Sequence, residues 1–145
     1  MSQENVEVVR RVYEAAARRD RATVFSLYDP DVEWDGTRSR WSEVSTGKPH
    51  FHGHEDLQRF FRQYYEMWES FEDDLQELID AGDQVVSVVT SRGRGRASGV
   101  DVEWPGNVGV WTIRNGKVVR VVWFSTRGEA LEAVGLSEQD AHAES

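Results

Sequence analysis

The stretch VGVWTIRNGKVVRVVWFSTRGEALEAVGL, from Val108 to Leu136, decides the fold. It contains two apolar runs that are joined by Asn115-Gly116, and a short helical segment then ends at Gly135. Asn-Gly between two such runs favours a type I′ turn, because both central residues of that turn need a positive φ. We therefore expect a β-hairpin followed by a helix over residues 127–134, with Gly135 as its C-cap.

The hairpin has two apolar faces. Pairing outward from the turn sets Arg114 against Lys117, Ile113 against Val118, Thr112 against Val119, Trp111 against Arg120 and Val110 against Val121. One face then carries Val108, Val110, Val119, Val121 and Trp123, and the other carries Trp111, Ile113, Val118, Val122 and Phe124. Neither face is polar enough to lie in water, so we expect helices of this chain to cover one face. A second copy of the chain would cover the other, which predicts a homodimer through the outer face of the sheet.

Length and composition indicate a single globular domain. The chain has 145 residues, of which 39% are apolar and 30% are charged, and it contains six Trp and no Cys. The lack of Cys excludes disulfides, thiolate catalysis and thiolate metal sites. The net charge of −9 argues against a nucleic-acid partner. No apolar run approaches a membrane span, and the acidic start MSQENVEVVRR does not resemble a signal peptide, so we expect a cytoplasmic protein without a membrane partner.

The remaining elements are predicted from periodicity and from Gly and Pro positions. A helix is expected over residues 4–19, a short helix over 22–28, a strand over 31–35 and a long polar loop over 36–49. A second long helix should begin near Gly53, with an apolar stripe that comprises Leu57, Phe60, Phe61, Tyr64 and Trp68. Strands are expected over 71–81, 84–96 and 100–104. We predict one α+β domain over residues 1–136 and a disordered tail over 137–145.

Three segments carry a family resemblance: YEAAARRDRATVFSLYDPDVEW, FHGHEDLQRFFRQY and GKVVRVVWFSTRGEALEAVGL. Over roughly residues 4–136 the chain resembles a SnoaL-like protein of the nuclear-transport-factor-2-like superfamily. The resemblance implies a cone, in which a curved, mostly antiparallel mixed sheet wraps around the N-terminal helices and leaves an internal pocket, and it commonly implies a homodimer. Members of the superfamily include polyketide cyclases, steroid isomerases, epoxide hydrolases and proteins that only bind or transport, so the fold does not decide the function.

Three residues are candidates for acid–base chemistry: Glu33, Asp35 and His52. Glu33 and Asp35 share one face of a short strand that, by the resemblance, matches the strand of the isomerases' catalytic base. Burial beside Trp34 would raise the pKa of either carboxyl toward neutrality, whereas at a strand edge both would be solvated. His52 is either a general base or hydrogen-bond partner at the pocket, or an ordinary loop histidine.

The isomerase constellation itself is not reproduced, since Val12 and about Gly109 occupy the positions of the oxyanion residues in the resemblance. The Asp–Arg–Asp arrangement of the epoxide hydrolases has only a weak match, which comprises Arg92, Arg94 or Arg120 with Asp101 or Glu103.

Six aromatic residues are candidates for the pocket wall: Tyr13, Trp34, Tyr64, Trp68, Trp111 and Trp123. Large flat side chains line apolar pockets and fill cores alike, so both interpretations place these rings inside the protein.

Two further motifs favour structural roles. His50, His52 and His54 alternate, but Gly53 breaks their geometry and no ligand follows at helical spacing, so we expect no metal site. In RGRGRASG (residues 92–99), a two-residue turn at Ser98-Gly99 would set Arg96 against Asp101 and Arg94 against Glu103. It would also set Trp104 over Gly93, and this ladder of opposite charges explains the Arg residues better than nucleic-acid binding.

We therefore expect a pocket for a small apolar molecule, with acid–base chemistry of the isomerase, cyclase or epoxide-hydrolase kind. Without a phosphate loop or a dinucleotide fingerprint we expect no cofactor. The alternative is a non-catalytic ligand-binding or dimeric assembly domain.

Overall fold

The computed structural model describes residues 2–39, 50–105 and 107–140. The helices are α1 (Ser2–Ala17), α2 (Arg21–Leu27), α4 (Gly53–Glu66) and α5 (Arg127–Ala133). The strands are β1 (Tyr28–Arg38), β2 (His50–His52), β3 (Trp68–Ala81), β4 (Gln84–Gly95), β5 (Asp101–Trp104), β6 (Val108–Arg114) and β7 (Lys117–Phe124). None of the helices in these ranges is long and apolar enough to cross a membrane.

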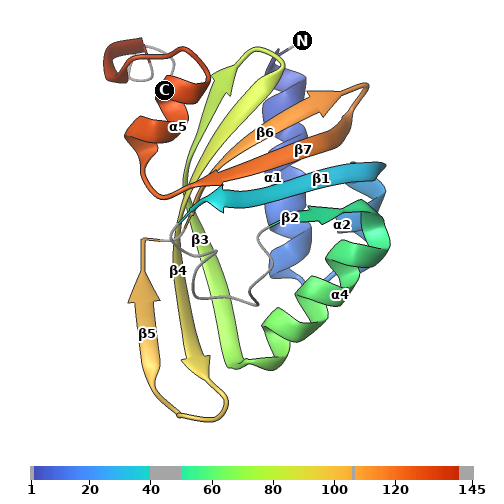
Figure 1. The fold of residues 1–145 in the computed structure, drawn as a ribbon, viewed down its shortest axis with the longest axis vertical. Coiled ribbons are helices and arrows are strands. Elements are labelled where there is room, and N and C mark those ends of the chain that lie inside the picture. Colours follow the sequence, from blue (N-terminus) through green and yellow to red (C-terminus); the bar gives the residue numbers. More distant parts are fainter. Residues whose placement is uncertain (1, 40–49, 106, 141–145) are drawn as a thin grey trace.

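The fold is α+β, as the sequence predicts, with helices against a curved, unclosed mixed sheet (Figure 1). Within the described ranges the strand order is β2-β1-β7-β6-β4-β3, and β5 pairs with β4 beyond the end of β6. Among the strand pairs of the described residues, only β1–β7 is parallel. Strands β3 and β4 run most of the length of the molecule, and α1 lies across the sheet on one side (Figure 1).

The predicted hairpin forms, but its register changes after two residue pairs. Asn115 and Gly116 have φ values of 53° and 75°, and Arg114 pairs with Lys117 and Ile113 with Val118. A β-bulge then leaves Val119 without an opposing residue, so Thr112 pairs with Arg120 and Trp111 with Val121. The predicted pairing beyond Ile113 is therefore wrong by one residue, because one extra residue on one strand reverses the faces of all that follow.

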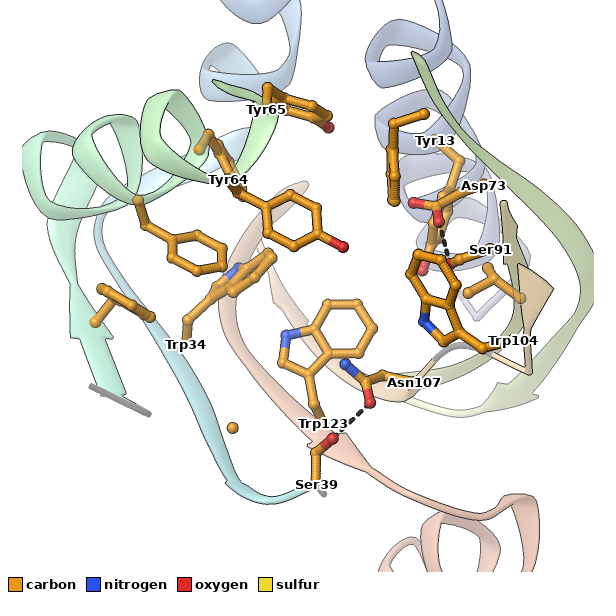
Figure 2. Close-up of a pocket in the computed structure, with 16 residues that line it drawn as sticks. Tyr13, Trp34, Ser39, Tyr64, Tyr65, Asp73, Ser91, Trp104, Asn107 and Trp123 are labelled. Carbon is orange, nitrogen blue, oxygen red and sulfur yellow. Dashed lines mark hydrogen bonds between the residues drawn. The ribbon is translucent and has the colours of Figure 1, made fainter. Parts of the chain in front are cut away.

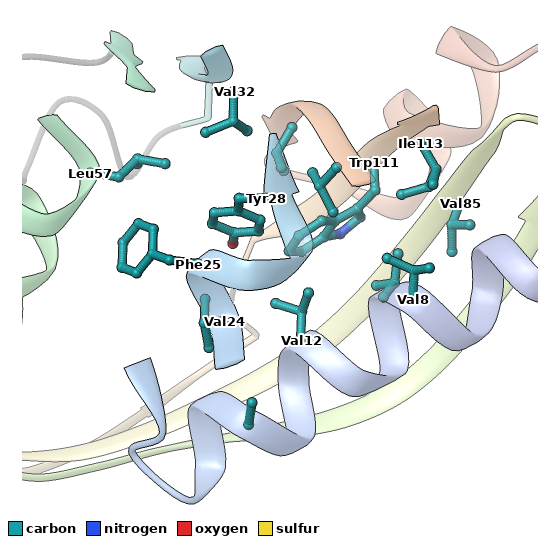
Figure 3. Close-up of a cluster of buried hydrophobic side chains, with 14 of the residues drawn as sticks. Val8, Val12, Val24, Phe25, Tyr28, Val32, Leu57, Val85, Trp111 and Ile113 are labelled. Carbon is teal, nitrogen blue, oxygen red and sulfur yellow. The ribbon is translucent and has the colours of Figure 1, made fainter. Parts of the chain in front are cut away.

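The bulge decides which rings share the inside of the cone. Trp123 now lies on the same face as Trp111, and the two rings meet edge to face with centroids 5.7 Å apart. The inner core gathers apolar residues from the helices and from the inner face of the sheet (Figure 3). Its fully buried members include Val9, Val32, Leu57, Val85, Trp111, Val118 and Val121.

The outer face of the sheet is covered by the chain's own C-terminal helix. Ala130 and Leu131 of α5 pack on an outer cluster that comprises Ile79, Val86, Val108, Val110 and Phe124. Arg127 holds the helix to β3 by donating two hydrogen bonds to Glu77 (2.9 and 3.1 Å). Gly135, at φ 77°, ends the helical segment as predicted. This part of the outer face does not require a second subunit for its burial, and the homodimer stays a prediction.

The β4–β5 hairpin has a longer turn than the sequence predicts. Arg94 pairs with Asp101 and Arg92 with Glu103, because the connection runs over residues 96–100 rather than Ser98-Gly99 alone. Opposite charges still face each other, and Arg94 donates to both carboxylate oxygens of Asp101 (2.9 and 3.0 Å). The ring over Gly93 is Trp68, not Trp104, since a Cβ there would lie 2.6 Å from Trp68 Cε3.

The predicted tail and long loop are described only in part. Residues 138–140 form a helical turn that Ser137 and Asp140 cap reciprocally, and the disorder of the tail stays a prediction. Residues 141–145, and the part of the predicted loop over residues 40–49, lie outside the described residues.

We predict that Gly109→Ala destabilises the fold by about 1–3 kcal/mol, the usual cost of overpacking. A Cβ at this position would lie 2.8 Å from Trp111 Nε1, 2.8 Å from Trp123 Cζ3 and 2.9 Å from Ser87 Oγ. Urea unfolding measures the change. The control is Gly128→Ala in α5, where a Cβ meets nothing within 4 Å. It should be neutral or stabilise by up to about 1 kcal/mol, and equal effects of the two substitutions would contradict the packing argument.

Candidate functional site

The inside of the cone holds two neighbouring cavities of about 130 and 100 Å³. Their common wall consists of Tyr13, Trp34, Phe61, Tyr65, Asp73 and Trp123. Each alone is of the size that admits a single aromatic ring, and because the two share this wall of side chains, a molecule with two fused rings would extend from one into the other. Figure 2 shows the larger cavity, which is ringed by aromatic side chains from α1, β1, α4, β3, β5 and β7.

Asp73 is the acidic residue among these rings. It lies on β3 in the same phase as Phe71 and Leu75, so its side chain points inward while Glu72 and Asp74 point outward. The opposite residue on β4 is Ser91, which is buried and whose Oγ donates to Asp73 Oδ1 at 2.5 Å (Figure 2). Strand alternation therefore sets a hydrogen-bonded carboxyl into an otherwise aromatic cavity.

The surroundings of Asp73 favour its protonated form. Burial raises the pKa of this carboxyl above its usual value, although the hydrogen bond from Ser91 and the charge of Arg19 act in the opposite direction. The Asp73 side chain is nevertheless exposed, because solvent reaches it through both cavities and through a cleft between α1 and β3. A carboxyl with a raised pKa in a reachable cavity is a candidate acid–base group.

Arg19 lies at the edge of that cleft. It has a left-handed backbone (φ 59°), and its Nη2 donates to the Phe71 carbonyl oxygen at 2.8 Å. Its guanidinium lies 4.5 Å from the centroid of the Tyr65 ring. These contacts hold a positive charge close enough to Asp73 to influence its ionisation.

Tyr13 forms the floor of both cavities. Its hydroxyl is 2.9 Å from Ser87 Oγ, which also accepts a hydrogen bond from Trp111 Nε1 at 2.8 Å. Burial raises the pKa of Tyr13 far above its ordinary value, so its ring presents a neutral phenol. Ser87 is fully buried, and these two partners satisfy it.

A second polar pair lines the larger cavity. Ser39, the residue after β1, donates from Oγ to Asn107 Oδ1 at 2.5 Å, and Asn107 is the residue before β6 (Figure 2). Trp104, which lines the cavity beside this pair, stacks on Trp68 with centroids 5.4 Å apart and planes at 21°.

The structure does not bring Glu33, Asp35 and His52 into the cavity. Glu33 pairs with His52 and Asp35 with His50, on the face of the sheet opposite to Trp34 and Phe51. Partial burial would raise the pKa of Asp35, but hydrogen bonds from Thr37 and the charges of His50 and Arg120 together lower it. Burial beside Trp34, on which the acid–base interpretation of these carboxyls depended, does not occur.

Five of the six aromatic candidates line at least one of the two cavities, and one does not. Tyr13, Trp34, Tyr64 and Trp123 line the larger cavity, and Trp111 lines the smaller one. Trp68 lines neither and instead backs Trp104.

The alternating histidines do not gather around one point. His54 Nε2 lies 3.0 Å from the Tyr28 carbonyl oxygen, whereas His52 is near Asp31 at 4.0 Å. Across residues 2–39, 50–105 and 107–140, no three His, Cys, Asp or Glu side chains are placed to hold a metal ion.

Sequence reasoning missed Asp73, Ser91 and Asn107. One signal for Asp73 was available: in FEDDL (residues 71–75) it occupies the apolar phase of the strand between Phe71 and Leu75. An acidic residue that alternates with apolar residues on a strand lies on the same face as they do, which indicates that its carboxyl points to the inside of the sheet. Ser91 and Asn107 have no comparable signal, because their roles depend on the register of β4 and on the contact between two distant loops.

Comparison with known proteins identifies the family. Residues 9–121 match the SnoaL-like domain, which is most of the chain, and the protein therefore belongs to the SnoaL-like family of the NTF2-like superfamily. No curated protein matches the chain.

Several solved structures have the same fold. An NTF2-like protein of unknown function from Burkholderia pseudomallei is 25% identical, with a TM-score of 0.74 over 91% of this chain and 98% of that chain. TerC, co-crystallised with polyporic acid, is 23% identical, with a TM-score of 0.73 over 90% and 98%. A putative polyketide cyclase from Sinorhizobium meliloti is 18% identical, with a TM-score of 0.60 over 81% and 93%. Likenesses at this level of identity show the fold.

We predict that Asp73→Asn stabilises the protein at neutral pH. The ionised carboxyl costs stability above its raised pKa, whereas the amide oxygen of Asn still accepts from Ser91. The gain should shrink as pH falls and vanish below the unfolded pKa of about 3.9. Urea unfolding across this pH range measures it.

The matched control is Asp35→Asn on the outer face. Because folding lowers the pKa of Asp35, its ionised form stabilises the protein above the unfolded pKa. This variant should be less stable than the wild type at neutral pH and equal to it in acid. If both substitutions change stability in the same direction, the assignment of Asp73 to a desolvating site is wrong.

Proposed function

We propose that this protein binds a small, flat, largely apolar molecule in the aromatic cavity and that Asp73 exchanges a proton with it. The observation that carries this proposal is the placement of one carboxyl, with a raised pKa, among the rings of the larger cavity. The rings supply apolar contact area and stacking, and the carboxyl supplies the orienting polar group.

The chemistry of Asp73 supports a role in proton transfer. A carboxylate with an ordinary pKa is a weak base at neutral pH, and a raised pKa strengthens it. Ser91 holds the carboxyl in one orientation while leaving its second oxygen without a hydrogen bond among the described residues. A ligand with an acidic O–H or C–H group could deliver its proton to that oxygen.

The reaction class that fits is acid–base isomerisation, cyclisation or hydrolysis. Structural neighbours bear the names polyketide cyclase, putative hydroxylase and ketosteroid isomerase-like fold, which span these and other chemistries. The alternative, a domain that binds a ligand without transforming it, uses the same cavity but needs no proton transfer at Asp73. A test of Asp73 itself therefore distinguishes the two.

The test uses β-naphthol, a flat phenol that becomes a strong acid when excited by light. Bound beside the Asp73 carboxylate, the excited phenol should transfer its proton to that carboxylate, and the complex should emit as naphtholate. Asp73→Asn should bind β-naphthol but emit mainly as the neutral phenol, because an amide is a poor proton acceptor. Excitation beyond the tryptophan absorption edge keeps the two signals apart.

Asp35→Asn serves as the control and should emit like the wild type, since Asp35 lies outside the cavity. Naphtholate emission should also decline in acid as Asp73 becomes protonated. Equal naphtholate emission from the wild type and Asp73→Asn would leave only the non-catalytic binding function. The absence of any binding would overturn the proposed ligand class.

A further inference from the structure

The Ser39–Asn107 pair orients an amide group at the wall of the larger cavity. The Ser39 side chain is buried, and its hydroxyl donates to the amide oxygen of Asn107. An Asn side chain has an acceptor oxygen and a donor NH₂ group, so this bond assigns the oxygen to Ser39 and leaves the nitrogen for the cavity. Figure 2 shows the nitrogen turned toward the side of the cavity formed by Trp123.

Nothing else in the described residues uses that nitrogen. The hydrogen bond of Asn107 with Ser39 engages its oxygen, and the other groups around the cavity are mainly aromatic rings. A ligand that displaces water from such a donor must offer an acceptor or lose affinity. The amide group therefore selects for an acceptor on the ligand.

The two polar pairs have complementary demands. The Asp73 carboxylate needs a donor, and the Asn107 nitrogen needs an acceptor, while the rings between them need a flat apolar body. We propose that Asn107 is a specificity-determining residue that binds a ketone or quinone oxygen of the ligand through its NH₂ group. This rests on the proposed function, because it names the class of molecule for the same cavity: a flat cyclic carbonyl compound.

The test compares α-tetralone with tetralin, which have the same fused rings with and without a carbonyl group. Wild type should bind α-tetralone about tenfold more tightly, in line with one hydrogen bond of about 1.4 kcal/mol. Asn107→Leu, with nearly the same shape, should lose this preference and still bind tetralin. Quenching of tryptophan fluorescence reports both affinities.

The carbonyl stretch of bound, isotopically labelled α-tetralone gives a second readout. It should lie at lower frequency in the wild type than in Asn107→Leu, since a hydrogen bond weakens the C=O bond. Gln63→Leu makes the same kind of change on an exposed position of α4 and should match the wild type in both measurements. If Asn107→Leu does not fold, Asn107→Asp keeps the volume, replaces NH₂ by oxygen and should also abolish the preference.

The outcomes separate the two proposals. One outcome is that tetralin binds, α-tetralone binds no more tightly than tetralin, and the carbonyl stretching frequency is the same in the wild type and Asn107→Leu. In that case the proposed role of Asn107 is wrong and the proposed function stands. A preference for the corresponding alcohol would show that Asn107 presents its oxygen, which also overturns this inference. If neither compound binds the wild type, both proposals fall.

Discussion

One buried hydroxyl holds the inside of the cone together. Ser87 on β4 accepts a hydrogen bond from Trp111 on β6 and bonds Tyr13 on α1, so it fixes the helix against two strands. No solvent reaches it, and losing either partner would leave a buried polar group unsatisfied. The bare backbone of Gly109 makes room for this contact. The position of Tyr13, and with it the floor of both cavities, depends on this arrangement.

The two cavities exist because side chains do not fill all of the space between helices α1 and α4. Helix α1 packs mainly on β3 and α2 and to a lesser extent on β4 and β7, whereas α4 packs on β1, β2 and β3. Aromatic rings fill part of the space between the two helices but leave the cavities between them. Asp73 on β3 lines both cavities and is also exposed to solvent, so its carboxyl can be reached from outside. This combination supports the proposal that a ligand binds beside a proton-exchanging group.

Much of the fold follows from local sequence patterns, and the site follows from register. Asn115-Gly116, Gly135 and the apolar stripe that includes Leu57 and Phe60 specify the hairpin, the last helix and α4 by short-range chemistry. The faces of the hairpin do not follow, because the bulge at Val119 has no local signal. The acid–base prediction selected carboxyls next to an aromatic residue in sequence, yet alternation sends Glu33 and Asp35 away from Trp34. Asp73 was not predicted as a site residue because β3 contains several other acidic residues that are exposed, and only its alternation with apolar residues sets it apart from them.

The most direct measurement is a carbon-13 NMR titration of the Asp73 carboxyl in the wild-type protein, assigned with Asp73→Asn and repeated with naphthalene bound. We expect a midpoint above the ordinary value of about 3.9, and a further rise when naphthalene displaces water from the cavity. A midpoint at or below that value, unchanged by naphthalene, would show that Asp73 is an ordinary solvated carboxyl and would contradict the account.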